Sequence, residues 1–388
     1  MTRYLKLFVC LAATLTATAL AQTTDQPEST KTTSPVAYVY VSGPTNIEAF
    51  AASSTGTLTP VPGSPFPGSL SHMSVNKTYL FGAGDNGKDI YTFLIESNGA
   101  LKQVSETNAQ KYNPYNCGSI GPTQIDYTGT TLYNQVNAGD CEDVTFIQAF
   151  KIEANGELQF IGNAMSGIPT DIASLSPLHF LGTNKFAYQT GCADDDGLVG
   201  PVNEVYKRES NGMLTTVAYD NVSPKTENPD DVYCPFLLAG DPANHLAVAY
   251  SLYNSNGFVG TKALASYTAD SHGNLTTTNT FENMPLISSE TDALSISPTG
   301  KLLAVGGVGF HVFHFNGSDP ITRFTVGRLN NYLFPEFGWD NNNHLYALTT
   351  DGALFVYTVT PTSITEVPGS PYTIPDQASS IIVRSLKD

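Results

Sequence analysis

The chain has 388 residues, of which only 14% are charged, and 35 acidic residues against 18 Lys and Arg give a formal net charge of −17. An apolar content of 41% and an aromatic content of 11% exclude intrinsic disorder, and the composition excludes a coiled coil or helical bundle. The acidic balance argues against a nucleic-acid partner, because such a protein needs a basic surface to replace the counterions of phosphate. With 33 Gly and 24 Pro among many Tyr, Phe, Val and Thr, the sequence favours short strands joined by tight turns.

The N-terminal segment has the pattern of an export signal. Arg3 and Lys6 precede an apolar run over residues 7–20, which ends in a small-x-small cleavage site. The run is too short to span a membrane, so we expect residues 1–21 to be cleaved and no membrane span to remain. Residues 22–35 are predicted to be a flexible leader rich in Thr, Ser and Pro. We therefore expect a secreted or periplasmic protein.

The cysteines that follow the predicted signal are even in number. In an oxidising compartment this indicates disulfides, and their spacings match no zinc signature. The four allow three pairings: they are Cys117, Cys141, Cys192 and Cys234.

One sequence phrase recurs along the chain. It begins with a predicted strand in which apolar and polar residues alternate and which carries an aromatic residue, and it continues with a few polar residues and then Gly-x-Leu. Clear copies cover residues 47–61, 90–104 and 147–161. Counting two decayed copies near the C-terminus, there are seven, and each has a marker aromatic. The markers are Phe50, Phe93, Phe150, Tyr206, Tyr267, Phe313 and Tyr357.

A second phrase, strand–turn–strand, precedes the first, and its clearest copy is ALSISPTGKLLAVGG at residues 293–307. Each repeat therefore predicts four short antiparallel strands at a period of roughly 40–60 residues, which is the pattern of a propeller blade. Residues 36–42 have the pattern of the second strand of a blade, but no first strand precedes them. Residues 377–385 have the pattern of a first strand, but no second strand follows them. We predict an all-β fold: a single seven-bladed β-propeller over residues 36–386, closed by pairing of its N- and C-terminal strands. An open array or a β-sandwich is the alternative.

Three phrases, at residues 85–104, 147–161 and 297–307, resemble those of the lactonase-type seven-bladed propellers, the 6-phosphogluconolactonase-like group. The resemblance covers roughly residues 36–385. It implies the propeller fold and, for the enzymes of the group, hydrolysis of a lactone ring. The family shows Pro-His-type motifs just before its inner strands, and in this sequence His72 is the one histidine at such a position.

The longest loops of the repeats should share one face of the propeller, where the inner strands begin. All four cysteines fall in or beside these loops, and their order along the blades predicts the pairs Cys117–Cys141 and Cys192–Cys234. Each bridge would stabilise the fold by about 2–4 kcal/mol.

Four candidate catalytic residues stand at the starts of predicted inner strands: His72, Asp171, Asp292 and Glu336. Carboxylates that converge on a channel can act as general bases or hold a cation, and a histidine can transfer a proton near neutral pH. The alternative is that these residues cap backbone groups or contact water in the channel.

Five aromatic residues in the long loops are candidate binding residues: Tyr112, Tyr115, Tyr233, Tyr253 and Phe258. Such loops suit carbohydrate or protein recognition, unless the rings only pack within their own loops. The run Asp194–Gly197 lacks the alternating spacing of a calcium loop, so we interpret it as a solvated acidic loop. Asp85, Asn86 and Asp89 receive the same interpretation, and no cofactor or metal is expected.

Two functions from different classes follow. The first is a non-catalytic binding module, a monomer that takes a carbohydrate, lactone or protein ligand on its loop face. The second is a hydrolase acting on an unphosphorylated lactone in the central channel. A phosphorylated substrate is disfavoured, because it requires clustered Arg or Lys. With a single histidine at the family's motif positions, the sequence favours binding.

Overall fold

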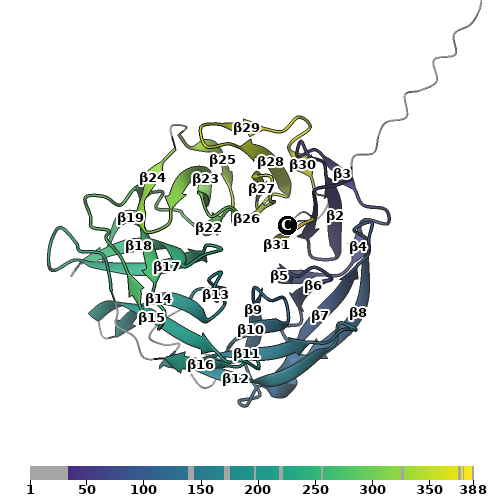
Figure 1. Cartoon of the computed structure of the whole chain (residues 1–388), viewed down its shortest axis with the longest axis horizontal. Coiled ribbons are helices and arrows are strands. Elements are labelled where there is room, and N and C mark those ends of the chain that lie inside the picture. The colour runs from purple at the N-terminus through teal and green to yellow at the C-terminus, as the bar shows by residue number, and fades with distance from the viewer. Residues whose placement is uncertain are drawn as a thin grey trace, which may run out of the picture. The chain divides into compact units, whose positions relative to one another are not determined.

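The computed structural model describes residues 34–138, 144–169, 175–195, 198–217, 222–254, 257–324, 327–374, 377–378 and 380–386. Within these ranges the chain forms seven antiparallel sheets arranged as blades around a central axis (Figure 1). The predicted seven-bladed β-propeller is therefore confirmed. The predicted signal peptide and most of the predicted leader lie outside the described residues. No helix in the described part of the chain is long and apolar enough to cross a membrane.

Blade 1 holds both ends of the propeller. Strand β31 pairs antiparallel with β1, with Val39 opposite Val383, so the C-terminal strand supplies the inner strand of the first blade as predicted. The blade consists of β31 (Ser380–Ser385), β1 (Ala37–Ser42), β2 (Asn46–Ala52) and β3 (Leu58–Pro60), with β4 (Phe66–Pro67) also paired to β2.

Blades 2 to 4 follow in chain order, each with its first strand innermost. Blade 2 consists of β5 (Leu70–Val75), β6 (Tyr79–Gly84), β7 (Asp89–Ile95) and β8 (Leu101–Asn108), and a 3₁₀ turn, η1 (Ala109–Tyr112), follows it. Blade 3 consists of β9 (Ser119–Ile125), β10 (Thr131–Asn137), β11 (Val144–Ile152) and β12 (Leu158–Pro169). Blade 4 consists of β13 (His179–Phe180), β14 (Phe186–Asp195), β15 (Leu198–Arg208) and β16 (Leu214–Val217).

Blades 5 to 7 each carry an additional short strand paired to the sheet. Blade 5 consists of β17 (Val232–Gly240), β18 (His245–Asn254), β19 (Gly257–Ala269), β20 (Leu275–Thr276) and β21 (Leu286–Ile287). Blade 6 consists of β22 (Ala293–Ile296), β23 (Leu302–Asn316), β24 (Asp319–Arg323) and β25 (Leu329–Leu333). Blade 7 consists of β26 (Glu336–Trp339), β27 (His344–Leu348), β28 (Ala353–Val359), β29 (Ile364–Glu366) and β30 (Tyr372–Thr373).

Blade 6 differs from the sequence pattern in one respect, because its second and third strands are continuous in β23. The first half of β23 pairs with β22 and the second half with β24. The backbone N–H of Phe315 donates to the carbonyl of Lys301, so the chain folds back on itself within this element. Gly309 lies in the reversal with φ = +72°, a conformation that favours glycine.

The hydrophobic core is divided into clusters, and each cluster fills the interface between two neighbouring blades. Blades 1 and 2, for example, share a cluster that includes Tyr40 and Leu80, and blades 7 and 1 share one that includes Val356 and Val39. The described residues form seven such clusters, one for each neighbouring pair including the pair that closes the ring. An open array of seven blades would have only six interfaces, so the packing itself confirms closure. All seven marker aromatics are buried in this core.

Tyrosine hydroxyls add a repeated polar contact between blades. A tyrosine on the second strand of one blade donates to a carbonyl in the turn before the last strand of the next, as Tyr38 does to Ser97 (2.8 Å) and Tyr79 to Ala154 (2.7 Å). In the first of these turns Gly99 has φ = +87°, and a Cβ there would lie 2.4 Å from the Tyr38 ring. The Gly of the repeated Gly-x-Leu phrase is therefore required by both backbone conformation and packing.

A disulfide joins blades 4 and 5. Cys192 of β14 and Cys234 of β17 are bonded, with their Cα atoms 5.1 Å apart, as predicted. Cys117 is also disulfide-bonded, and its predicted partner Cys141 lies outside the described residues. A disulfide is in keeping with an oxidising compartment.

Candidate functional site

The innermost strand of every blade runs in the same sense, so the propeller has two functionally different ends. We call the end where the inner strands begin the loop end, and the end where they turn into the second strands the turn end. The loop end carries the residues that the sequence singled out. The turn end carries a cavity on which residues from several blades converge.

His72 lies at the loop end, in a β-bulge of β5. Ser71 pairs with Ala83 and Ser74 with Phe81, so His72 and Met73 both stand opposite Gly82. The backbone of His72 has φ = +47°. This conformation is rare for residues other than glycine, and it is often retained at functional positions. Its imidazole is solvent-exposed on the innermost strand, while the surrounding protein lowers its pKa through desolvation. At neutral pH His72 is therefore a neutral base.

Glu336 is the first residue of β26 and is half-buried. Its Oε2 accepts a hydrogen bond from the backbone N–H of Ile381 (2.7 Å), and Ser380 also hydrogen-bonds the carboxylate. Burial raises the pKa of Glu336 to about 7, because it outweighs these two hydrogen bonds, which act in the opposite direction. The carboxyl group therefore titrates in the range where general acids and bases operate.

Asp292 is exposed just before β22, and its neighbourhood contains a lysine that the sequence did not single out. Lys262 of β19 donates to the carbonyl of Thr291 (3.4 Å), and its Nζ lies 4.4 Å from the centroid of the Phe236 ring. Desolvation lowers the pKa of Lys262, and the charge of Asp292 partly opposes this effect. The pair places one positive and one negative group at the loop end between blades 5 and 6.

Backbone contacts link the loop-end candidates, whereas direct side-chain contacts do not. Ser380, which bonds Glu336, accepts from the backbone N–H of Met73 (3.3 Å), and the carbonyl of His72 accepts from Thr123 (2.6 Å). A polar chain thus runs across the inner strands of blades 7, 1, 2 and 3. Among the described residues no hydrogen bond or ion pair joins the side chains of His72, Asp292 and Glu336 to one another, and no group of three potential metal ligands gathers. Asp171 lies outside the described residues.

Three of the five predicted binding aromatics pack within the propeller. Tyr112 stacks on Phe160 with ring centroids 4.4 Å apart, Tyr115 packs against Phe146, and Tyr233 is buried. Two of these rings thus pack against strands of blade 3, and a binding role for the three remains a prediction.

The other two predicted aromatics form a pair near the tip of the β18–β19 hairpin. Tyr253 and Phe258 have ring centroids 5.7 Å apart, and Phe258 is 45% exposed. Their role in binding remains a prediction.

The acidic loops do not form a cation site in the described residues. The side chain of Asn86 donates to Asp89 and accepts from the backbone N–H groups of Lys88 and Asp89, so this segment is closed by its own hydrogen bonds. The side chains of residues 194 and 195 and all of residues 196–197 lie outside the described part.

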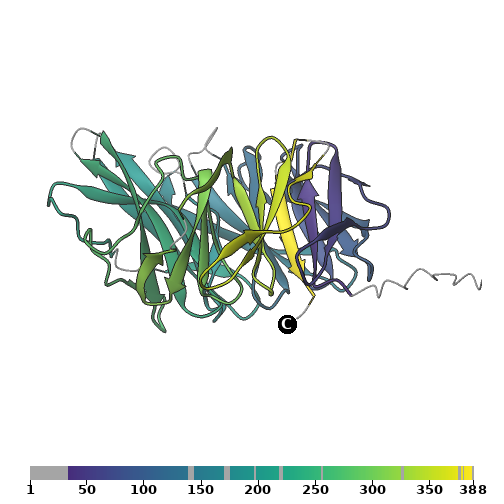
Figure 2. The same cartoon turned by 90° about the horizontal axis from the view of Figure 1, so that it is seen from above.

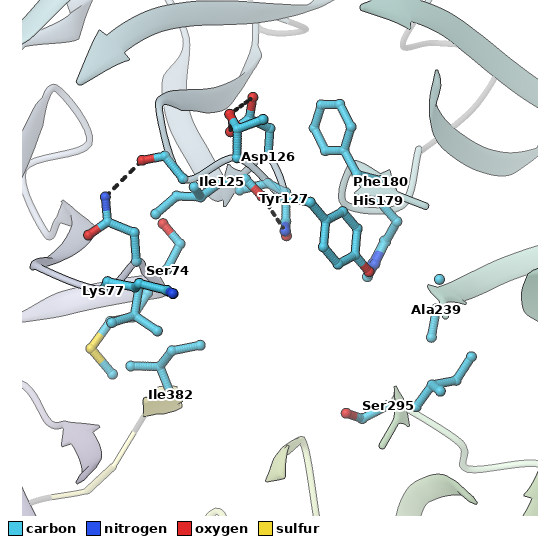
Figure 3. A pocket seen from close by; sticks show the side chains of 18 of the residues that line it. Ser74, Lys77, Ile125, Asp126, Tyr127, His179, Phe180, Ala239, Ser295 and Ile382 are labelled. Carbon is cyan, nitrogen blue, oxygen red and sulfur yellow. Dashed lines mark hydrogen bonds between the residues drawn. The ribbon is translucent and has the colours of Figure 1, made fainter. Parts of the chain in front are cut away.

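The turn end contains a cavity of about 620 Å³ on the central axis. Its wall comes from the inner strands of six blades, β31, β5, β9, β13, β17 and β22, and from the turns that follow two of them. Figure 3 shows Lys77, Tyr127, His179 and Ser295 around this space, with their side chains directed towards it. This volume lies within the range of about 300–1,000 Å³ that is usual for small-molecule sites.

Comparisons with known proteins bear on the fold. No protein-family model matches the chain, and the search of curated proteins found no match. Solved structures do match. The periplasmic gluconolactonase PpgL of Pseudomonas aeruginosa has a TM-score of 0.64 and 13% identity over 90% of this chain and 99% of that one. A putative 6-phosphogluconolactonase from Bacteroides fragilis has a TM-score of 0.60 and 14% identity over 90% and 98% of the two chains.

The chain shares the seven-bladed propeller fold of these two structures. At these identities the likeness establishes the architecture, and the chemistry has to be argued from this chain's own residues. The resemblance seen in the repeat phrases is thereby supported at the level of fold.

The turn-end residues were not recognised in the sequence, because their motifs have an immediate structural explanation. The segment Asp126–Gly129 matches an ordinary turn, and Asp126 indeed accepts hydrogen bonds from the N–H groups of Thr130 and Thr131. Tyr127 is unusual in this segment, because a turn does not require a large aromatic residue at that position. Tyr127 and His179, at the start of β13, are therefore the sequence features that could have indicated a site at the turn end.

Proposed function

We propose that this protein is an exported, non-catalytic binding propeller that takes a carbohydrate ligand on its loop end, at the extended hairpins of blades 4 and 5. The observation that carries the proposal is the exposed aromatic tip of β18–β19. Tyr253 pairs with Phe258 across the hairpin, and beside the 45% exposed Phe258 the side chain of Val259 is 44% exposed. An exposed aromatic ring held by a neighbouring ring is a suitable surface for stacking against a sugar.

The hairpins that present this tip are long and fixed. Strands β14 and β15 have 10 and 11 residues, and β18 and β19 have 10 and 13, against 5 and 7 for the equivalent strands β27 and β28 of blade 7. The edge-on view shows the long teal and green strands of this part of the chain (Figure 2). The Cys192–Cys234 bridge ties the two blades together, so a ligand meets a surface that is already ordered, which lowers the cost of binding.

Binding is preferred to catalysis because the candidate catalytic groups are held apart. Glu336 is engaged by Ile381 and Ser380, and Asp292 stands beside Lys262, on a different pair of blades from His72. Catalysis by a nucleophile and base requires the two groups to lie within hydrogen-bond reach of each other or of a shared water. Among the described residues no hydrogen bond or ion pair joins two of these candidates.

We expect Phe258→Ala to remove glycan binding. The test is a glycan array probed with wild-type protein and the variant, with Phe281→Ala as the matched control because Phe281 is similarly exposed (39%) and lies in the segment between β20 and β21. Binding should fall about tenfold or more in Phe258→Ala and stay unchanged in the control. Equal loss in both variants, or a wild-type protein that binds no glycan, would contradict the proposal.

Lactone hydrolysis is the second candidate, and the specific observation that favours it is the pKa of about 7 for Glu336. The proposal of binding predicts no turnover of a panel of unphosphorylated sugar lactones above the buffer rate. Turnover by the wild type that drops about 100-fold or more in Glu336→Gln, and also in His72→Ala, would show instead that the loop end is an active site. Export and the oxidising compartment are common to both candidates.

A further inference from the structure

We propose that the turn-end cavity is a second ligand site, separate from the loop end, and that it takes a small uncharged polyhydroxylated ring such as a pyranoside, stacked on Tyr127 and hydrogen-bonded by His179. The proposal goes beyond the proposed function, since it concerns the opposite end of the inner strands and other residues.

Tyr127 is an exposed aromatic ring that is nevertheless held in place by three blades. It lies in the turn after β9 of blade 3, its backbone N–H donates to Asn184 of blade 4 (3.0 Å), and its hydroxyl donates to the carbonyl of Asp241 of blade 5 (3.3 Å). Even so, 52% of the residue is exposed. The ring spans the wall of the cavity with one part of its surface open (Figure 3), and a rigid Tyr offers contact area at little entropic cost.

His179 supplies the directional contact. It is the first residue of β13 and lines the cavity beside Tyr127 (Figure 3). Burial lowers the pKa of His179 to about 4, so at neutral pH the imidazole is uncharged and has one N–H donor and one acceptor. No hydrogen bond to a described residue occupies either ring nitrogen. A hydroxyl group of a ligand can both donate and accept, and it therefore matches this group.

Two charged residues, Asp126 and Lys77, stand among the described residues that line the cavity. Asp126 is the one carboxylate among the lining residues, and it is already satisfied by Arg208 at 2.5 Å and by the hydroxyl of Thr128 at 2.9 Å. Apart from Lys77 and His179, the remaining polar side chains of the wall are hydroxyls and amides, such as Ser295 and Gln124, and they come from different blades. Uncharged donors and acceptors around an aromatic surface suit a neutral sugar ring.

The test is an NMR titration of full-length mature protein, labelled in its tyrosine rings, with methyl β-glucopyranoside as the neutral probe and gluconate as the open-chain anion. The Tyr127 signal is assigned by its absence from Tyr127→Phe. We expect the glucoside to shift the Tyr127 signal and gluconate to have little effect. Tyr127→Ala and His179→Leu should each weaken the glucoside about tenfold, and Tyr127→Phe should retain most of the affinity because the ring remains.

Two controls separate this site from the loop end and from misfolding. Phe258→Ala should leave the glucoside titration unchanged, so a failure of the proposed function and a failure of this site are distinguishable. Melting temperatures of the variants identify any that do not fold, and Tyr127→Phe and His179→Leu each probe the site without removing the bulk of the side chain. The proposal is overturned if the glucoside causes no shift of Tyr127, if affinity is unchanged in both Tyr127→Ala and His179→Leu, or if gluconate binds more tightly than the glucoside.

Discussion

Replacing Asp340 by alanine is expected to lower the free energy of unfolding by about 3–5 kcal/mol, the usual cost of removing one partner of a buried polar pair. Asp340 is fully buried in the turn between β26 and β27. Its Oδ1 accepts from the backbone N–H groups of Asn342 and His344 (both 2.9 Å), and its Oδ2 accepts from His344 Nδ1 (2.7 Å) and Tyr346 Oη (2.9 Å). Alanine leaves all four donors without this acceptor, and the three that belong to His344 and Tyr346 are buried.

The chain contains a matched control for this variant in blade 5. Asp241 makes the same contacts in its turn, to the N–H groups of Ala243 and His245 (both 2.8 Å) and to His245 Nδ1 (2.7 Å). That pair is more open, with 25% of the His245 side chain exposed against 3% for His344, and no tyrosine hydroxyl is bonded to the carboxylate. Asp241→Ala should therefore cost less, because water can replace part of what is lost.

Urea unfolding of the wild type and both alanine variants measures the difference. Asp340→Asn should lie between the wild type and Asp340→Ala, because the amide oxygen still accepts from the backbone. An Asp340→Ala protein within about 1 kcal/mol of the wild type, or equal to Asp241→Ala, would show that burial of this turn does not determine its contribution.

The fold could be predicted from the sequence because the determinants of a blade are local and repeated. Each marker aromatic, such as Phe150 or Tyr206, is a buried residue of a third strand, and the Gly that follows is fixed by its turn. Ring closure could be inferred as well, since residues 36–42 and 377–385 have the patterns of two strands that are neighbours in one blade. The continuity of β23 could not be inferred, because a tight reversal at Gly309 leaves no polar loop to mark it.

The geometry of the loop end depends on features without a sequence signature. Glu336 is the first residue of its strand, whereas His72 is the third residue of β5. The direction of a side chain depends on the pairing register, and the bulge in β5 changes that register between Ser71 and Ser74. A one-residue change of register turns a side chain to the other face of a strand. Whether residues at equivalent strand starts converge is therefore decided by the folded backbone.

The turn-end cavity depends on contacts between blades that are far apart in the sequence. Tyr127 is held by Asn184, 57 residues away, and by Asp241, 114 residues away. Neither contact belongs to the repeat that contains Tyr127. A repeat pattern describes what each blade has in common with the others, whereas this site is formed where the blades differ.

Glu336→Gln is expected to change the pH dependence of stability. As pH rises from 5 to 8, the free energy of unfolding of the variant should increase relative to that of the wild type. The pKa of Glu336 is about 7 in the folded protein and 4.5 for a free glutamate, so between these values the folded state binds the proton that the unfolded state has released. The stabilisation is fully present below pH 4.5 and is lost as pH rises through 7. At about 1.36 kcal/mol for each pKa unit, the wild type loses roughly 2–3 kcal/mol over this range through this group.

Glutamine keeps an acceptor for the Ile381 N–H and cannot ionise, so the variant escapes that loss. The measurement is the free energy of unfolding of both proteins at pH 5, 6, 7 and 8, and the quantity of interest is the difference between them at each pH. Glu96→Gln, at an exposed position, is the control and should give a difference that does not vary with pH. A difference for Glu336→Gln that is equally flat would mean that this carboxylate is charged throughout the range, and its candidacy as a general acid would end with it.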